Sequence, residues 1–165
     1  MTSPAIGTPP DSARSPRPGA HIGKRLLAML YDLLPVLALW FLLGFAFALG
    51  YMLAGHAPRE NIQPWSALQW LLWLCCWLVT GVYATLSWRR GGQTLGMRPW
   101  RIRLLAADND QPPAWPVLWR RYALATLSLA AGGLGFWWAW FDRDRLTWHD
   151  RATGTRIVHE PRKKR

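Results

Sequence analysis

Apolar residues are arranged along this chain in three long blocks, and the charged residues lie between them. Residues 33–54 contain 22 positions without a charged side chain, residues 61–88 contain 28, and residues 122–141 contain 20. A soluble domain of this length would instead interleave polar and apolar residues with a period of 3.6 or 2. The pattern therefore predicts an all-α integral membrane protein.

The first two blocks are long enough to cross a bilayer. Twenty-two helical residues extend over about 33 Å, which exceeds the hydrocarbon core of about 30 Å. The second block has Trp65 near its start and Trp88 at its end, and tryptophan is enriched at both membrane–water interfaces. We therefore expect two transmembrane helices.

The third block is interrupted by glycine. Gly132, Gly133 and Gly135 lie in its middle, and glycine weakens a helix. A block of 20 residues is close to the minimum for one crossing and too short for two. Two alternatives follow: a plain third crossing, or a re-entrant hairpin that returns to the side from which it entered.

The twenty Lys and Arg residues predict the orientation. Four precede the first block, one lies in the loop 55–64, and seven lie in the connector 89–121. Cytoplasmic loops are rich in Lys and Arg, so the N-terminus and this connector should be cytoplasmic. Residues 142–165 hold the other eight; a hairpin would keep them cytoplasmic, and a full crossing would not.

The composition of the ends predicts the domain organisation. Residues 1–20 are rich in proline and small polar residues, which predicts a disordered tail. Residues 21–158 form the transmembrane domain, and residues 159–165 form a basic tail. The net charge of +11 is explained by the basic loops of a membrane protein, and we expect no nucleic acid among the partners.

Charged residues also occur near the first block. Arg25 and Asp32 are seven positions apart and share one face of a helix. An ionisable residue close to a membrane span is a candidate for function. The alternative is an interfacial acid on a helix that starts before the bilayer.

Two strings of small and polar residues follow the second and third blocks. The first contains Gly92, Gln93, Thr94, Gly96 and Arg98. The second contains His149, Asp150, Arg151, Gly154 and Thr155. With Arg25 and Asp32, and in this order around three apolar blocks, these strings make residues 21–158 resemble the RDD family of bacterial multi-pass membrane proteins.

The resemblance implies the bacterial inner (cytoplasmic) membrane and a characteristic set of one Arg and two Asp, which here are Arg25, Asp32 and Asp150. We expect these three residues to approach one another on the cytoplasmic side. The chain departs from the family pattern at Met97, where lysine is usual, and at Pro99 and Trp100, where small aliphatic residues are common. The family implies little about chemistry.

No catalytic or metal-binding pattern is recognisable. The chain has no phosphate-binding loop, dinucleotide fingerprint or nucleophile elbow. His149 and Asp150 are adjacent, but His21, His56 and His159 are scattered, and a zinc site needs three or four ligands. We therefore expect no enzyme, no metal and no cofactor.

Two functions of different classes remain. The chain could be a transporter or ion-conducting subunit that uses Arg25, Asp32 and Asp150 as a buried charge cluster. The alternative is a non-catalytic membrane adaptor or assembly factor in which the same charges are structural. Three apolar blocks are few for a self-sufficient transporter, so the expected partners are the lipid bilayer and either further copies of the chain or another membrane protein.

Overall fold

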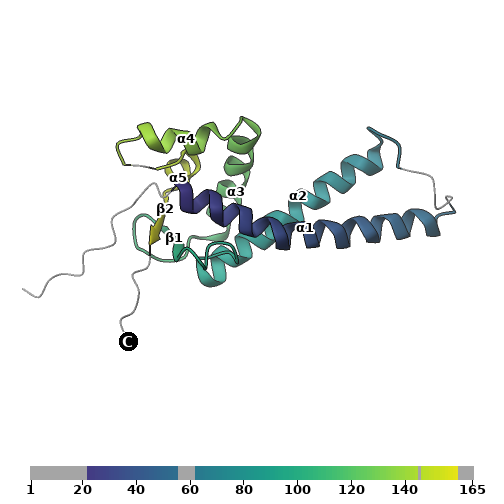
Figure 1. Cartoon of the computed structure of the whole chain (residues 1–165), viewed down its shortest axis with the longest axis horizontal. Coiled ribbons are helices and arrows are strands. Elements are labelled where there is room, and N and C mark those ends of the chain that lie inside the picture. Colours follow the sequence, from purple (N-terminus) through teal and green to yellow (C-terminus); the bar gives the residue numbers. More distant parts are fainter. Residues whose placement is uncertain (1–21, 56–61, 145, 160–165) are drawn as a thin grey trace, which may run out of the picture.

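Two long helices dominate the structure (Figure 1). The computed structural model describes residues 22–55, 62–144 and 146–159; the predicted tails lie outside these residues, apart from His159. Helix α1 is Ile22–Leu53 and helix α2 is Ala67–Gly91, and both are long and apolar enough to cross a membrane. The prediction of a helical membrane protein with two transmembrane helices is confirmed.

The two helices are covered little by the rest of the chain. The most hydrophobic stretch of 18 residues in α1 contains no buried residue. Trp40 of α1 donates a hydrogen bond from Nε1 to Oγ1 of Thr80 in α2 at 2.9 Å. Side chains such as Phe41 and Leu53 are at least three-quarters exposed. An apolar surface of this extent fits a lipid environment.

The third apolar block forms two helices with a sharp bend between them. Helix α3 is Trp115–Ala130 and helix α4 is Leu134–Phe141, and their axes differ by 95°. Gly132 and Gly133, at the bend, have φ of 71° and 79°, which glycine adopts without the penalty of a Cβ atom. The predicted interruption by glycine is confirmed.

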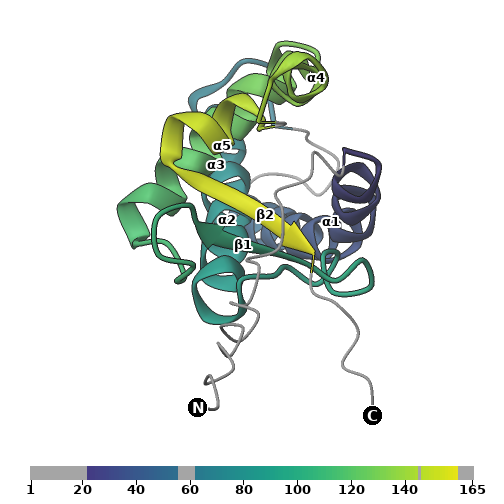
Figure 2. The ribbon, with the colours of Figure 1, turned by 90° about the vertical axis from the view of Figure 1, so that its left-hand side faces the viewer.

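Helix α3 is inclined to the other two helices and packs against α2, where the Tyr122 hydroxyl donates to the backbone oxygen of Trp77 at 2.8 Å. It lies across the end of the α1–α2 pair, where α1 begins and α2 ends (Figures 1 and 2). It also begins at Trp115, seven residues before the uncharged block that the sequence marks. The segment is therefore not one straight helix; the bent pair is either a broken span or a re-entrant segment.

The chain also contains a small sheet, which the sequence did not predict. Strands β1 (Ile102–Ala106) and β2 (Thr155–His159) pair antiparallel, with Ile102 opposite His159 and Ala106 opposite Thr155. Helix α5, Trp148–Thr153, leads directly into β2. The partial alternation of Arg101, Ile102, Arg103 and Leu104 is compatible with an extended segment or an interfacial helix, and the structure shows the extended form in β1.

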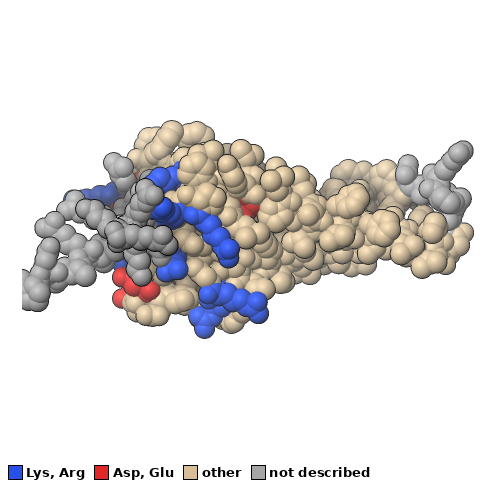
Figure 3. All heavy atoms as spheres, turned by 60° about the horizontal axis from the view of Figure 1, so that its bottom comes forward, with Lys and Arg blue, Asp and Glu red and all other residues tan. Residues whose placement is uncertain are grey.

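The largest hydrophobic core lies beside this sheet, at the end of the molecule where α1 begins (Figure 2). Its buried residues come from α1, the segment after α2, both strands and α3: Ala28, Met97, Ile102, Leu104, Leu118 and Ile157. Lys and Arg gather around the same end on the face in Figure 3, whereas the far part of the α1–α2 pair is free of charged residues there. The described residues thus form a polar end, around the start of α1, and an apolar pair of helices that extends away from it.

Candidate functional site: a buried charge cluster and a bound carboxylate

Asp150 is held in place by the start of helix α5. Thr147 caps this helix: its side chain accepts a hydrogen bond from the Asp150 backbone N–H at 3.4 Å, and the Asp150 carboxylate accepts one from the Thr147 N–H at 3.3 Å. This reciprocal arrangement is a capping box. It fixes the orientation of the Asp150 carboxylate, which is completely buried.

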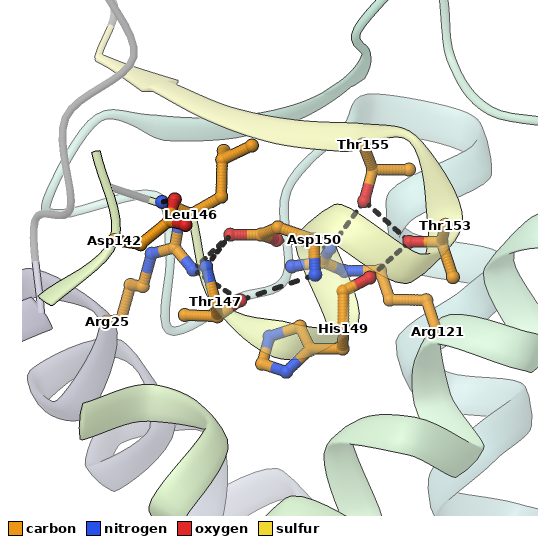
Figure 4. Close-up of polar contacts among 9 residues, drawn as sticks. All are labelled: Arg25, Arg121, Asp142, Leu146, Thr147, His149, Asp150, Thr153 and Thr155. Atoms are coloured by element: carbon orange, nitrogen blue, oxygen red, sulfur yellow. Dashed lines mark hydrogen bonds and ion pairs between the residues drawn. The ribbon is translucent and has the colours of Figure 1, made fainter. Parts of the chain in front are cut away.

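Two arginines from distant parts of the chain pair with this carboxylate (Figure 4). Arg25 Nη1 in α1 lies 2.6 Å from Oδ2 of Asp150, and Arg121 Nη1 in α3 lies 2.5 Å from Oδ1. The same two guanidinium groups donate to Thr147 and Thr155 at 3.2 and 2.5 Å. We call Arg25, Arg121 and Asp150 the charge cluster.

The electrostatics of the cluster favour an ionised Asp150. Burial opposes its ionisation, but the positive charges of Arg121 and Arg25 outweigh that effect and hold the pKa of Asp150 below its usual range. Both arginines are at most 4 % exposed. A buried charge is tolerated when it is paired and hydrogen-bonded, so the cluster joins α1, α3 and α5 through one carboxylate.

His149 lies beside the cluster without joining it. Its ring points away from the Asp150 carboxylate, toward the space between the helices (Figure 4), and stacks edge-on against Phe136 of α4. Burial, with a smaller contribution from Arg121, lowers the pKa of His149 to about 3. The imidazole is therefore neutral at physiological pH.

This lowered pKa predicts that acid destabilises the protein through His149. The unfolded chain takes up a proton near the ordinary pKa of 6.5, whereas the folded chain takes it up only near 3. The unfolded state therefore binds more protons between these values, and stability falls as pH falls from 6.5 toward 3, by at most about 1.4 kcal/mol per pH unit.

The measurement is thermal unfolding in detergent between pH 7 and pH 4. Over this range, the melting temperature of His149→Gln should fall less than that of the wild-type protein. His159→Gln, at the partly exposed end of β2, is the matched control and should follow the wild type. If the wild type and His149→Gln are equally sensitive to acid, the lowered pKa of His149 does not determine how stability depends on pH.

Asp32 lies apart from the charge cluster, and the expectation that it joins Arg25 and Asp150 is wrong. Its carboxylate accepts hydrogen bonds from the Tyr83 hydroxyl at 2.6 Å, from the Thr94 hydroxyl, and from the Gly96 N–H at 2.8 Å. Among the described residues no Lys or Arg forms a salt bridge with it. Arg121, not Asp32, completes the cluster.

The string after α2 explains how Asp32 is held. Gly92 ends α2 with φ of 67°, and Thr94 and Gly96 then turn toward α1 and donate to the carboxylate. Met97, at the position where the family usually has lysine, is buried in the core. Gln93 is partly buried and Arg98 is exposed; within this string, Thr94 and Gly96 donate the hydrogen bonds to Asp32.

The second string, which contains His149 to Thr155, mainly contributes residues that form or contact the charge cluster. Thr155 accepts from Arg121, and Gly154 ends α5 with φ of 58°. Arg151 reaches back to pair with the buried Asp142 at the end of α4. These contacts hold the short helix α5 against α3 and α4.

Sequence reasoning missed Arg121 and Thr147. Arg121 directly precedes the third apolar block, where a basic residue is normally assigned to the membrane interface. The signal for Thr147 was present, because a threonine three residues before an acid is the pattern of a capping box. Among the described residues, no group of three or more His, Cys, Asp or Glu side chains is placed to bind a metal.

Comparison with known proteins identifies one relationship. The sequence model of the RDD family matches residues 19–154. No curated protein and no solved structure matches the chain.

Proposed function

Since the chain belongs to the RDD family, we propose that it is a non-catalytic adaptor or assembly factor of the bacterial cytoplasmic membrane. In this proposal the charge cluster is structural, and the protein acts by binding lipid or protein partners within the bilayer. Further copies of the chain are suitable partners, because the apolar surface of α1 is covered so little by its own fold.

The observation that best supports this proposal is that both carboxylate oxygens of Asp150 are already bound by other side chains. Both of its oxygens pair with guanidinium groups, Thr147 binds it as well, and its side chain has no exposed surface. A carboxylate that relays ions or protons must exchange partners and reach water during its cycle. A carboxylate held this firmly is suited to joining α1, α3 and α5.

The cluster also supports a topology. Arg25 and Asp150 are in contact, so both belong on the same side of a bilayer that α1 and α2 cross. The excess of Lys and Arg assigns that side to the cytoplasm. The bent pair α3–α4 would then lie at the cytoplasmic face. It would not cross the bilayer, so both ends of the chain would be on the same side.

Topology reporters test this arrangement. A reporter fused after Arg165 or inserted at Asp108 should read cytoplasmic, and one inserted at His56 should read external, because two crossings return the chain to its starting side. A C-terminal reporter on the side of His56 would contradict the topology. Insertions that abolish expression are replaced by single cysteines at the same positions, labelled from either side.

Reconstitution tests whether the protein transports ions. Purified protein in liposomes should give no flux of protons, sodium or potassium above that of empty liposomes, because the charge cluster offers no exchangeable site. Flux that requires Asp150 but survives Asp144→Asn would overturn the structural assignment. Asp144 is a suitable control because its side chain is 62 % exposed and, among the residues that the structure describes, forms an ion pair only with Arg151, at 3.9 Å.

Asp32 favours ion transport as a second candidate function. Its carboxylate lies in α1, borders a cavity and forms no salt bridge with a described residue. Cation flux that is lost in Asp32→Asn and retained in Asp150→Asn would select this candidate. The same liposome assay therefore separates the two functions.

A further inference from the structure

A cavity of about 330 Å³ lies between α1, α2 and α3. Most of its lining is apolar, with Leu33 and Val36 from α1, Ala84 from α2, and Ala125 and Leu129 from α3. Leu33 and Leu129 are close to half exposed, so the apolar wall continues to the exposed apolar surface of α1 and α3. The wall suits a hydrocarbon chain.

One end of the cavity is polar. Arg25, Arg121 and His149 all line it, and each is at most 4 % exposed. Nε of Arg25 and Nδ1 of His149 are buried without a hydrogen-bond partner among the described residues. Burying such atoms unpaired costs free energy. An acceptor placed at this end would satisfy Nε of Arg25, and also Nδ1 of the neutral His149 in its Nδ1–H tautomer.

The charge at this end selects an anionic acceptor. Two guanidinium groups share the single carboxylate of Asp150, which leaves the cluster one positive charge in excess. One further carboxylate would bring it to neutrality. Asp32 does not supply that carboxylate, because it is engaged by Tyr83, Thr94 and Gly96.

We propose that this cavity binds a long-chain fatty acid, with its carboxylate at Arg25 and His149 and its hydrocarbon chain between α1 and α3. The site needs neither transport nor an adaptor role, so it goes beyond the proposed function. A single-chain ligand fits better than a phospholipid, because the polar end is buried and a bulky headgroup has no space among residues so little exposed.

Binding to the full-length protein in phosphatidylcholine nanodiscs tests the proposal, with dodecanoate carrying a ¹³C label at its carboxyl carbon. We expect saturable binding of one dodecanoate per chain. Dodecan-1-ol should compete at least about tenfold more weakly, because its neutral hydroxyl accepts a hydrogen bond from Arg25 but forms no ion pair with it. Dodecyltrimethylammonium should not compete.

Two variants locate the site. Ala125→Phe fills the cavity and should abolish dodecanoate binding, whereas Ala123→Phe, on the same helix but not among the lining residues, should leave it intact. His149→Phe keeps an aromatic ring beside Phe136 but removes the unpaired nitrogen. It should weaken dodecanoate binding and leave dodecan-1-ol binding unchanged.

Several results would overturn the proposal. These are the absence of saturable binding, equal binding of the acid and the alcohol, equal loss in Ala125→Phe and Ala123→Phe, and stronger binding of dodecyl phosphate than of dodecanoate. Stronger binding of the cationic amphiphile would instead place the polar group at Asp32. If Ala125→Phe does not fold, the selective effect of His149→Phe on the acid decides the question.

Discussion

Replacing Asp150 with Ala should destabilise the protein by about 3–5 kcal/mol, the range for removing one partner of a buried ion pair. The substitution leaves Arg25 and Arg121 facing each other without the carboxylate between them. It also removes the acid of the capping box and so weakens α5. Unfolding by SDS in mixed micelles measures the loss of stability. The control is Asp144→Ala, which should change stability little because the Asp144 side chain is exposed.

A double-mutant cycle shows whether the effect comes from the pairing. Arg25→Met alone should be strongly destabilising, but Arg25→Met combined with Asp150→Ala should cost less than the sum of the two single losses. Residues in one salt-bridge network couple by about 0.5–3 kcal/mol. Additive losses, or a loss in Asp150→Ala no larger than in the exposed control, would show that the pair does not hold the fold.

The membrane-spanning part of the fold could be predicted because its signal is local. The uncharged blocks 33–54 and 61–88 are long enough to cross a bilayer by themselves, and they became α1 and α2. The structure extends α1 back to Ile22. This extension places Arg25 and Asp32 on the helix itself, as their shared face predicted.

The polar end could not be predicted in the same way, because its contacts join residues far apart in the sequence. Strand β1 pairs with β2 across about fifty residues, and neither segment has a strand pattern strong enough to indicate the pairing. Arg121 reaches Asp150 only because α3 lies across the end of α1 and α2. The family resemblance supplied Asp150, the correct partner of Arg25, together with Asp32, which does not join the cluster, and it gave no information about Arg121.

Replacing Gly96 with Ala should separate the loop after α2 from α1. A Cβ atom at Gly96 would lie 2.0 Å from the backbone oxygen of Ala28 and 2.8 Å from the backbone nitrogen of Asp32. Both atoms belong to a helix backbone, which cannot move aside as a flexible side chain can. The expected loss of stability is about 3 kcal/mol, the upper end of the usual range for overpacking.

The matched control is Gly91→Ala, at the end of α2, where an added Cβ would meet nothing within 4 Å. Alanine favours a helix over glycine, so this variant should be as stable as the wild type or slightly more stable. Gly96→Ala should also resemble Asp32→Asn, because moving the loop breaks the hydrogen bonds from Thr94 and Gly96 to the carboxylate. If Gly96→Ala is as stable as Gly91→Ala, the loop does not contact α1 as described. The role assigned to this glycine would then be wrong, together with the account of how Asp32 is held.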